Sequence, residues 1–380
     1  MDFALKDHQR LIRDTVRAFM ETEIRPNVKE WERTEHFPVA ALKKLAEMGC
    51  CGMLMPEEWG GPGLDTVSYV LMIEEVARVH TAISTALGVT NSAVQIPLLM
   101  FGSADQKSHY LKALAAGEIL GAFCLTEPAA GSDAAGLQAT ATRTGGNYKL
   151  NGTKTWVTNG SAAGVFLVFA KTDPAAGGKG ISAFLVEPGF PGFKVGRHED
   201  KMGQRSSPSV ELTFNDCEVP ASARVGEEGQ GLKIALSALD GGRIGIAAQA
   251  VGLAQGALDE SVKFAKARKA FGKAIGEFQA IQWMLADMQT EIEAARGLVY
   301  RAAYLKDAGG KMGSAASRAK LYASEMVNRV VYKAVQIQGS QGYSRESEVE
   351  RMYRDARVIS IYEGTSEVQR MIIARELLGA

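Results

Sequence analysis

A carboxylate beside a glycine, near the end of the chain, is the first group that could do chemistry. Glu363 lies in Ile361-Tyr-Glu-Gly-Thr-Ser-Glu-Val-Gln-Arg370, directly before Gly364. Beside a bound ligand such a carboxylate could act as a general base, and the glycine would let the ligand approach closely. The structural alternative is that Ser360-x-x-Glu363 forms a capping box and that Thr365 caps the last helix. Spacing alone favours the structural alternative.

Two central segments have the residue types of a ligand cradle. Phe123-Cys-Leu-Thr-Glu-Pro-Ala-Ala-Gly-Ser-Asp133 is a polar turn whose backbone N–H groups and hydroxyls could hold a ligand. Thr155-Trp-Val-Thr-Asn159 places Trp156 and Thr158 on one face of a strand, which would suit a flat heteroaromatic cofactor. An ordinary loop and a half-buried aromatic residue are the structural alternatives.

Three further segments could contact a ligand, although each signal is weak alone. Two place an arginine beside glycines, Leu239-Asp-Gly-Gly-Arg243 and Arg268-Lys-Ala-Phe-Gly272, and arginine suits bidentate phosphate binding. A lone helical arginine is more often solvated or paired with a carboxylate. The third, Gln336-Ile-Gln-Gly-Ser-Gln-Gly-Tyr343, could be a helix end or a close backbone approach.

Several common site motifs are absent from the sequence. No G-K-[ST] follows the polar turn and no G-x-G-x-x-G joins a strand to a helix, which argues against Walker A and Rossmann sites. The four cysteines lack C-x-x-C spacing and the five histidines lack H-E-x-x-H. A structural zinc site or a disulfide framework is therefore not expected.

Composition narrows the class of protein. The 380 residues, 46% apolar and 23% charged, suit a globular chain of two to three domains. The 43 basic residues balance the 43 acidic ones, which argues against a nucleic-acid binder and an anionic-membrane binder. No apolar run approaches a membrane span of about 20 residues, and the longest candidate, 244–258, contains Gln249 and Gln255. The N-terminus lacks the apolar stretch of a signal peptide, so a soluble cytoplasmic protein is expected.

The elements that must position these groups begin with helices. Apolar residues three and four apart predict a helix from residue 11 that ends at Pro26 and another over 39–48 that stops at Gly49. A loop at 56–63 precedes further helical patterns over 66–116.

The pattern then changes to strands and back to helices. Apolar or alternating runs predict strands at 165–171, 181–186 and 210–214, and Asn151-Gly152 indicates a hairpin turn. Helical patterns follow at 230–268, 277–307, 314–338, 347–357 and 366–378. Long helices with short connections suggest a bundle.

Taken together and in this order, the segments resemble the acyl-CoA dehydrogenase family over nearly the whole chain. The resemblance rests on Leu-Thr-Glu-Pro-x-x-Gly-Ser-Asp from Leu125, Trp-Val-Thr-Asn from Trp156, and Lys201-Met-Gly-Gln-Arg205. It continues through Asp240–Arg243, Arg268 with Phe271-Gly272, Gln279, the Gln336 segment and Tyr362-Glu-Gly-Thr. Several collinear motifs make the match specific.

The resemblance implies an α+β multidomain fold. We expect an N-terminal α-helical domain over 1–119, a central β-barrel-like domain over 120–228 and a C-terminal four-helix bundle over 229–380. Members of the family bind FAD non-covalently and usually form homotetramers built as dimers of dimers.

The resemblance also assigns roles residue by residue. Glu363 matches the catalytic base. Positions expected to bind FAD are Phe123, Leu125, Thr126, Ser132, Trp156, Val157, Thr158, Arg268, Phe271, Gln279, Gln336, Ile337, Gly339, Ser340, Thr365 and Glu367, of which Arg268, Gln279 and 336–340 would reach from a neighbouring subunit. Positions expected to contact the acyl-CoA are Ser132, Asp240, Arg243, Tyr362 and Gly364.

The implied reaction is α,β-dehydrogenation of an acyl-CoA to trans-2-enoyl-CoA, with electrons passed to an electron-transferring flavoprotein. Trp156 and Glu199 match surface positions linked to that transfer. One branch of the family carries its base on the long helix just before the matching arginine, where this chain has Gly242. The sequence therefore looks like the short- and medium-chain branch, and the Leu-Asp-Gly-Gly-Arg run most resembles short-chain, butyryl-type enzymes.

Three alternatives stay open at this point. The first is an acyl-CoA oxidase or monooxygenase of the same family, which would pass electrons to oxygen. The second is a non-catalytic DNA-binding relative, which the balanced charge disfavours. The third is a helical scaffold without a cofactor.

Overall fold

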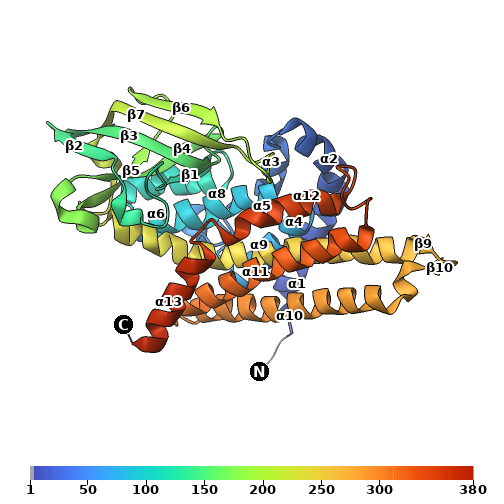
Figure 1. The fold of residues 1–380 in the computed structure, drawn as a ribbon. Coiled ribbons are helices and arrows are strands. Elements are labelled where there is room, and N and C mark those ends of the chain that lie inside the picture. The colour runs from blue at the N-terminus through green and yellow to red at the C-terminus, as the bar shows by residue number, and fades with distance from the viewer. Residues whose placement is uncertain (1–3, 311, 380) are drawn as a thin grey trace.

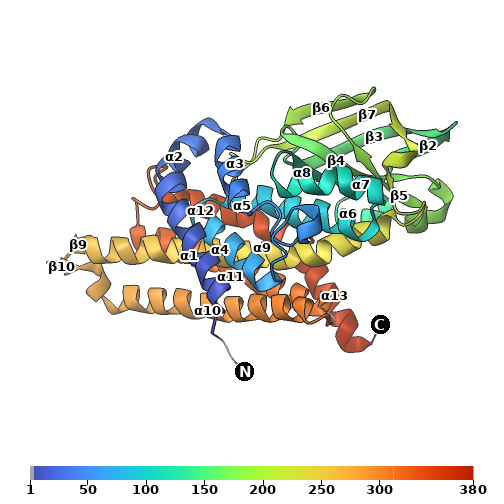
Figure 2. The ribbon, with the colours of Figure 1, turned by 180° about the vertical axis from the view of Figure 1, so that it is seen from behind.

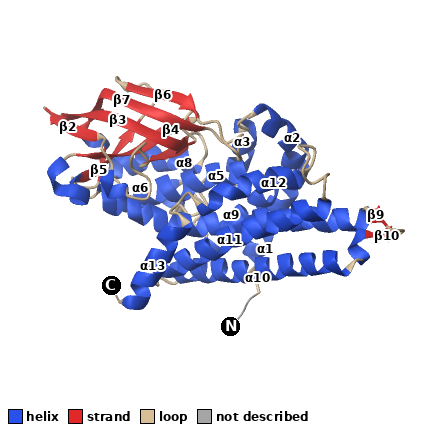
Figure 3. Cartoon of the chain, in the orientation of Figure 1, coloured by secondary structure: helices blue, strands red, loops and turns tan. Residues whose placement is uncertain are grey.

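The protein consists of N-terminal helices, a central sheet and long C-terminal helices (Figure 1). The computed structural model describes residues 4–310 and 312–379. Figure 3 shows the large sheet at one end of the molecule, with helices forming the rest. The predicted order of helices, strands and helices is confirmed.

The N-terminal region contains eight α-helices among its described residues. They are α1 (Asp7–Phe19), α2 (Arg25–Thr34), α3 (Val39–Glu47), α4 (Thr66–Val79), α5 (Thr81–Gly88), α6 (Ile96–Phe101), α7 (Ala104–Gln106) and α8 (Lys112–Ala115). Figure 2 shows α1 crossing in front of α9, the longest helix.

The predicted helix end at Pro26 is wrong. A π-helical turn, Met20–Ile24, joins α1 to α2, and Pro26 lies in the first turn of α2. The π-helical turn, in which the Arg25 N–H bonds to the Met20 carbonyl five residues earlier, carries the helical run past the proline. The predicted stop at Gly49 is confirmed, since α3 ends at Glu47 and Gly49 has a φ of +80°.

The expectation that no apolar run approaches the length of a membrane span needs correction. The continuous helical run Thr81–Phe101, formed by α5, a π-helical turn and α6, has 21 residues and a hydropathy of 1.2, which meets that test by length and composition. The run is 72% buried inside the protein, as expected for a core helix. Sequence inspection missed it because polar residues such as Asn91 and Gln95 interrupt its apolar pattern, and these side chains bond to the carbonyls of Cys50 and Cys51.

The central region contains an eight-stranded sheet. Its strands are β1 (Leu120–Cys124), β2 (Thr140–Thr144), β3 (Asn147–Thr158), β4 (Ala163–Lys171), β5 (Ile181–Val186), β6 (Phe193–His198), β7 (Ser209–Pro220) and β8 (Arg224–Val225). The order is β6-β7-β3-β2-β4-β5-β8, with β1 parallel to β4.

Strand β4 is buried on both faces, which explains why its sequence is continuously apolar. Phe166 and Val168 face a core enclosed by the strands, whereas Leu167 and Phe169 face a second core that helices α6, α8 and α9 complete. Because successive side chains of a strand point to opposite faces, a strand buried on both faces must be apolar at every position.

The predicted hairpin turn at Asn151-Gly152 is wrong. The turn is Gly145-Gly146, between paired Thr144 and Asn147, and Gly152 lies inside β3 at a register shift opposite β7. A Cβ on Gly152 would lie 2.8 Å from the Cβ of Ala139, and its φ is +141°. A glycine is therefore needed at position 152 by a bulge and by the close approach of Ala139, not by a turn.

The C-terminal region consists mainly of long helices. They are α9 (Gly231–Ala267), α10 (Gln279–Asp307), α11 (Gly313–Gln338), α12 (Glu348–Ala356) and α13 (Ser366–Leu378), with a small hairpin of β9 (Lys269–Ala270) and β10 (Lys273–Ala274). These bounds agree with the predicted helices. Helices α4, α9, α10 and α11 share one continuous apolar core, so the N-terminal and C-terminal regions pack as a unit.

Candidate active site

Glu363 lies in a short turn between a 3-10 turn, Arg357–Ser360, and helix α13. The predicted capping box at Ser360 is wrong, because the Ser360 hydroxyl bonds to the backbone and side chain of Arg357. The cap predicted at Thr365 is confirmed, since its hydroxyl accepts a hydrogen bond of 3.3 Å from the Val368 N–H. Glu363 is therefore free of a capping role.

The Glu363 carboxylate lies directly over Gly242 of α9. A Cβ on Gly242 would stand 2.7 Å from Oε2, closer than real Cβ atoms approach, and 3.1 Å from Oε1, which is a tight contact. A glycine inside a helix costs roughly 1 kcal/mol relative to alanine. Here its missing side chain provides the space that the carboxylate occupies.

Burial raises the pKa of Glu363 toward neutrality. The residue as a whole is half-buried, but Oε2 itself is fully buried and has no hydrogen-bond partner among the described residues. Loss of hydration raises the pKa of Glu363 to about 7, against the opposing charges of Arg243 and Lys320. A carboxyl group with this pKa is suited to accepting a proton near neutral pH.

Arg243 and Asp240 lie on the same helix as Gly242. Arg243 is 5% exposed and donates to Asp240 over 2.6 Å, while its Nε is buried without a partner among the described residues. The structure therefore brings three predicted positions, Glu363, Arg243 and Asp240, to one place. An unpaired donor beside an unpaired acceptor is what a polar ligand would satisfy.

Tyr362 belongs to a hydrogen-bonded ring that joins three regions of the chain. Its hydroxyl donates to the Gln249 amide oxygen and accepts from the Gln204 amide over 3.2 Å. Thr85 closes the ring, because it donates to Gln204 over 2.7 Å and accepts from Gln249 over 2.7 Å. Side chains from α5, from α9 and from the segment before β7 therefore hold Tyr362, the residue that precedes Glu363.

Sequence reasoning missed the ring, although a signal was available. Gln249 is a polar residue in the apolar stretch of α9, and such a residue needs a buried partner. We used it only as an argument against a membrane span. Gln204 lies in the motif Lys201-Met-Gly-Gln-Arg205, to which we assigned no role.

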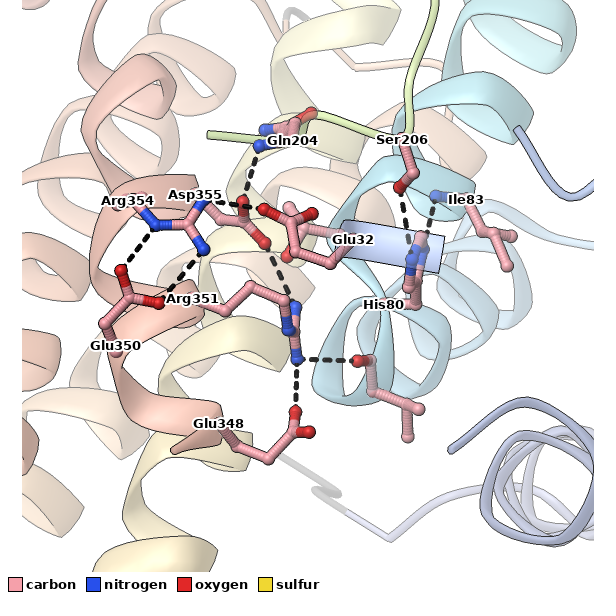
Figure 4. Close-up of polar contacts among 12 residues, drawn as sticks. Glu32, His80, Ile83, Gln204, Ser206, Glu348, Glu350, Arg351, Arg354 and Asp355 are labelled. Atoms are coloured by element: carbon pink, nitrogen blue, oxygen red, sulfur yellow. Dashed lines mark hydrogen bonds and ion pairs between the residues drawn. The ribbon is translucent and has the colours of Figure 1, made fainter. Parts of the chain in front are cut away.

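A buried ion cluster anchors the segment that contributes Gln204 (Figure 4). The Gln204 N–H donates to Asp355, which is paired with Arg351 over 3.0 Å. Arg354 joins Glu350 of its own helix to Glu32 of α2. The cluster therefore ties α12 and α2 to the loop that positions the ring.

A second buried ion pair supports the predicted cofactor loop. Lys154 of β3 contacts Glu127 over 2.6 Å and donates to the Leu125 carbonyl over 3.2 Å. The Thr126 carbonyl accepts from the Thr155 N–H over 3.0 Å. Lys154 and Glu127, which sequence reasoning missed, therefore hold the predicted segment around Leu125 and Thr126 in place.

The residues near Trp156 fit a flat polar cofactor such as FAD. Trp156 is 58% exposed, and the buried Thr155 Oγ1 and Asn159 Oδ1 have no partner among the described residues. The exposed aromatic face of Trp156 suits contact with a heteroaromatic ring. Leu125, Val157 and Ile337 are buried in apolar cores, so only their backbones could contact a cofactor.

The remaining predicted cofactor positions do not come together in one chain. Arg268, Phe271 and Gln279 lie at the β9–β10 end of α9 and α10, far along the molecule from the sheet that carries Trp156 (Figure 1). Phe271 is 96% exposed at the hairpin. The segment 336–340 ends α11, and Ser132, Gly339, Ser340 and Glu367 are exposed. This separation is compatible with the expected contribution from a neighbouring subunit and does not test it.

A cavity of about 730 Å³ lies between α2 and the segment after β6, and its lining includes Trp31, Glu199 and Arg205 but not Glu363. This cavity is therefore separate from the candidate base. Among the described residues, no three His, Cys, Asp or Glu side chains gather as a metal site would require.

Comparisons with known proteins identify the family to which the chain is similar. Models described as acyl-CoA dehydrogenase N-terminal, middle and C-terminal domains match residues 6–118, 122–217 and 229–378. An acyl-CoA dehydrogenase of Clostridium acetobutylicum, described as short-chain specific, is 46% identical over 99% of this chain and 100% of that protein. An acryloyl-CoA reductase (NADH) of Anaerotignum propionicum is also 46% identical, over 100% of this chain and 96% of that protein. A solved structure described as the electron transferring flavoprotein of Acidaminococcus fermentans contains a chain that matches with a TM-score of 0.99 and 47% identity, over 100% of both chains.

Proposed function

Because the chain belongs to the acyl-CoA dehydrogenase family, we propose that it converts a short-chain acyl-CoA to the trans-2-enoyl-CoA with Glu363 as the base. The observation that supports this most is the buried, unpartnered Glu363 carboxylate over Gly242. The cofactor is FAD. When bound, FAD supplies the acceptor for the hydride that leaves Cβ.

The chain's own residues would perform the proton transfer. Glu363 takes the Cα proton, and a pKa of about 7 leaves a large fraction of it ionised at neutral pH. The Glu363 backbone N–H would donate to the thioester carbonyl and stabilise enolate-like charge at the moment Cα loses its proton. Arg243, Asp240, Tyr362, Gly364 and Ser132 would hold the acyl-CoA.

Cofactor binding would be shared between subunits. Thr126, Trp156 and Thr158 would contact the flavin ring, and Thr365 and Glu367 would add contacts from the last helix. Arg268, Gln279 and the segment 336–340 would bind the FAD of a neighbour in a homotetramer. We place this enzyme in the cytoplasm, with an electron-transferring flavoprotein as acceptor near the exposed Trp156 and the half-buried Glu199.

The deciding experiment is anaerobic mixing of the purified yellow protein with a series of saturated acyl-CoAs. We expect about one FAD per chain, bleaching of the flavin and fastest reduction by acyl chains of roughly four to six carbons. A flavin-free protein that is fully folded would refute the proposal. Fastest reduction by long-chain acyl-CoAs would refute only the proposed preference for short acyl chains.

The acceptor is tested with the reduced enzyme. Stable reduced flavin in air, with turnover when an electron-transferring flavoprotein is added, supports the dehydrogenase. Rapid reoxidation by oxygen would favour the oxidase alternative. The reductase relative makes the reverse direction a second candidate, and consumption of NADH with an enoyl-CoA in the presence of the flavoprotein would favour it.

A further inference from the structure

The turn that carries Glu363 has an unfavourable backbone conformation. Glu363 has a φ of +54° and Gly364 a φ of +86°, so two consecutive residues are left-handed. An L-residue other than glycine avoids this region because its Cβ crowds the following carbonyl. Such a conformation persists only where its surroundings hold it, and these positions cluster at functional sites.

Two buried side chains bind the carbonyls of this turn. Lys320 of α11 donates from Nζ to the Gly364 oxygen over 2.8 Å. Gln369 of α13 donates from Nε2 to the same oxygen over 2.9 Å and to the Glu363 oxygen over 3.3 Å. Both side chains are fully buried, so no solvent competes for these bonds.

The arrangement leaves little room for another geometry. A Cβ on Gly364 would lie 2.6 Å from Gln369 Nε2, so a side chain at position 364 would displace the amide that binds this turn. The other end of the Gln369 amide, Oε1, is buried without a partner among the described residues. The donor end of Gln369 is therefore the end that the fold uses.

Lys320 keeps its charge despite its burial. Loss of hydration lowers the pKa of Lys320 to about 8, and the neighbouring Glu363 carboxylate opposes this shift while Arg243 adds to it. At neutral pH Lys320 is mostly an ammonium group, and a charged donor makes a stronger hydrogen bond than a neutral one.

We propose that Lys320 and Gln369 form a clamp that positions the base, by holding the left-handed turn so that the Glu363 carboxylate stays over Gly242. The inference rests on the proposed function, in which Glu363 is the base. Neither clamp residue has an assigned contact with the reacting atoms, so both are positioning residues.

The test uses the FAD-loaded enzyme and its Lys320→Met and Gln369→Met variants, which keep side-chain length but lose the donors. We expect the rate of flavin reduction by butyryl-CoA to fall about 10²-fold, because a small misplacement of a catalytic group has an effect of that size. The dissociation constant for the enoyl-CoA product, read from the flavin spectrum, should stay at the wild-type value. The double variant should lose little more than either single variant, since both donors hold one turn.

Two further variants separate the clamp from general damage. Lys320→Gln keeps a donor and should retain more activity than Lys320→Met. Lys333→Met is the matched control, because Lys333 lies on the same helix in surface ion pairs with Asp287 and Glu291. It should reduce its flavin at the wild-type rate. If Lys320→Met does not fold, Gln369→Met and Lys320→Gln carry the test.

Crystal structures of the Met variants give a second readout. We expect Glu363 and Gly364 to leave the left-handed region. Wild-type reduction rates in both Met variants, or an unchanged turn in both, would overturn the clamp. If none of the acyl-CoAs reduces the flavin of the wild-type enzyme, the proposed function fails. The crystal structures then still decide whether the clamp holds the turn.

Discussion

The contact between Glu363 and Gly242 gives a prediction whose size follows from the structure. In Gly242→Ala the new Cβ would lie 2.7 Å from Oε2, whereas ordinary contacts begin at 3.4 Å. The carboxylate must therefore move by about 0.7 Å, and since a 1 Å misplacement can cost about 10²-fold, we expect flavin reduction to slow by roughly 10-fold or more.

The assay is rapid anaerobic mixing of each variant with butyryl-CoA, followed at the flavin absorbance. Gly241→Ala is the matched control on the same helix, because its Cβ would meet only Lys306 Nζ, at 3.7 Å. It should react at the wild-type rate and gain up to about 1 kcal/mol of stability from better helix propensity. A Gly242→Ala enzyme that reduces its flavin at the rate of Gly241→Ala would refute the placement of the base over Gly242.

Four further predictions concern Glu363, Arg268 and Lys154. Glu363→Gln should retain FAD and acyl-CoA while flavin reduction falls by at least about 10²–10⁴-fold, because the general base is lost; near wild-type reduction in stopped-flow would mean that another base acts. Burial raises the pKa of Glu363 to about 7 in the folded protein, so its favourable contribution to stability is present at low pH and lost as pH rises through 7. Glu363→Gln should therefore raise the melting temperature relative to wild type more at pH 8 than at pH 5, and an equal difference at both would contradict the burial. Arg268→Ala should lose FAD and weaken subunit association at a cost of about 2–5 kcal/mol; a stable monomer with full FAD in light scattering would show that Arg268 does not reach a neighbour. Lys154→Met should destabilise the protein by up to about 3–5 kcal/mol in urea unfolding, because the buried Glu127 carboxylate loses its ammonium partner and keeps only the Gln138 and Ala139 backbone N–H groups; unchanged stability would contradict the pairing.

The sequence by itself determined the order of the elements and the family. Helix bounds over α9, α10 and α11 agreed with apolar periodicity because each helix buries one or more faces in a common core. Strands β4 and β5 were readable as apolar runs because both of their faces are buried. Glu363 was found through its motif neighbours, whereas spacing alone had favoured a cap.

Local signals failed where distant residues decided the outcome. The glycine of Asn151-Gly152 looked like a turn, but its neighbour Ala139, 13 residues earlier, requires a glycine within a strand. Pro26 looked like a helix end, but a π-helical turn carries the helical run past it. The contact with Ala139 is not visible in a short window around Gly152, and apolar spacing around Pro26 does not reveal the π-helical turn.

Only the tertiary structure decided what makes Glu363 a candidate base. Gly242, Lys320 and Gln369 are separated from it by 121, 43 and 6 positions, yet they set the space, the charge and the backbone conformation around its carboxylate. Burial shifts a pKa through the loss of water on every side, and that loss depends on which helices pack together. A sequence lists the groups, but it is their packing in three dimensions that removes the water.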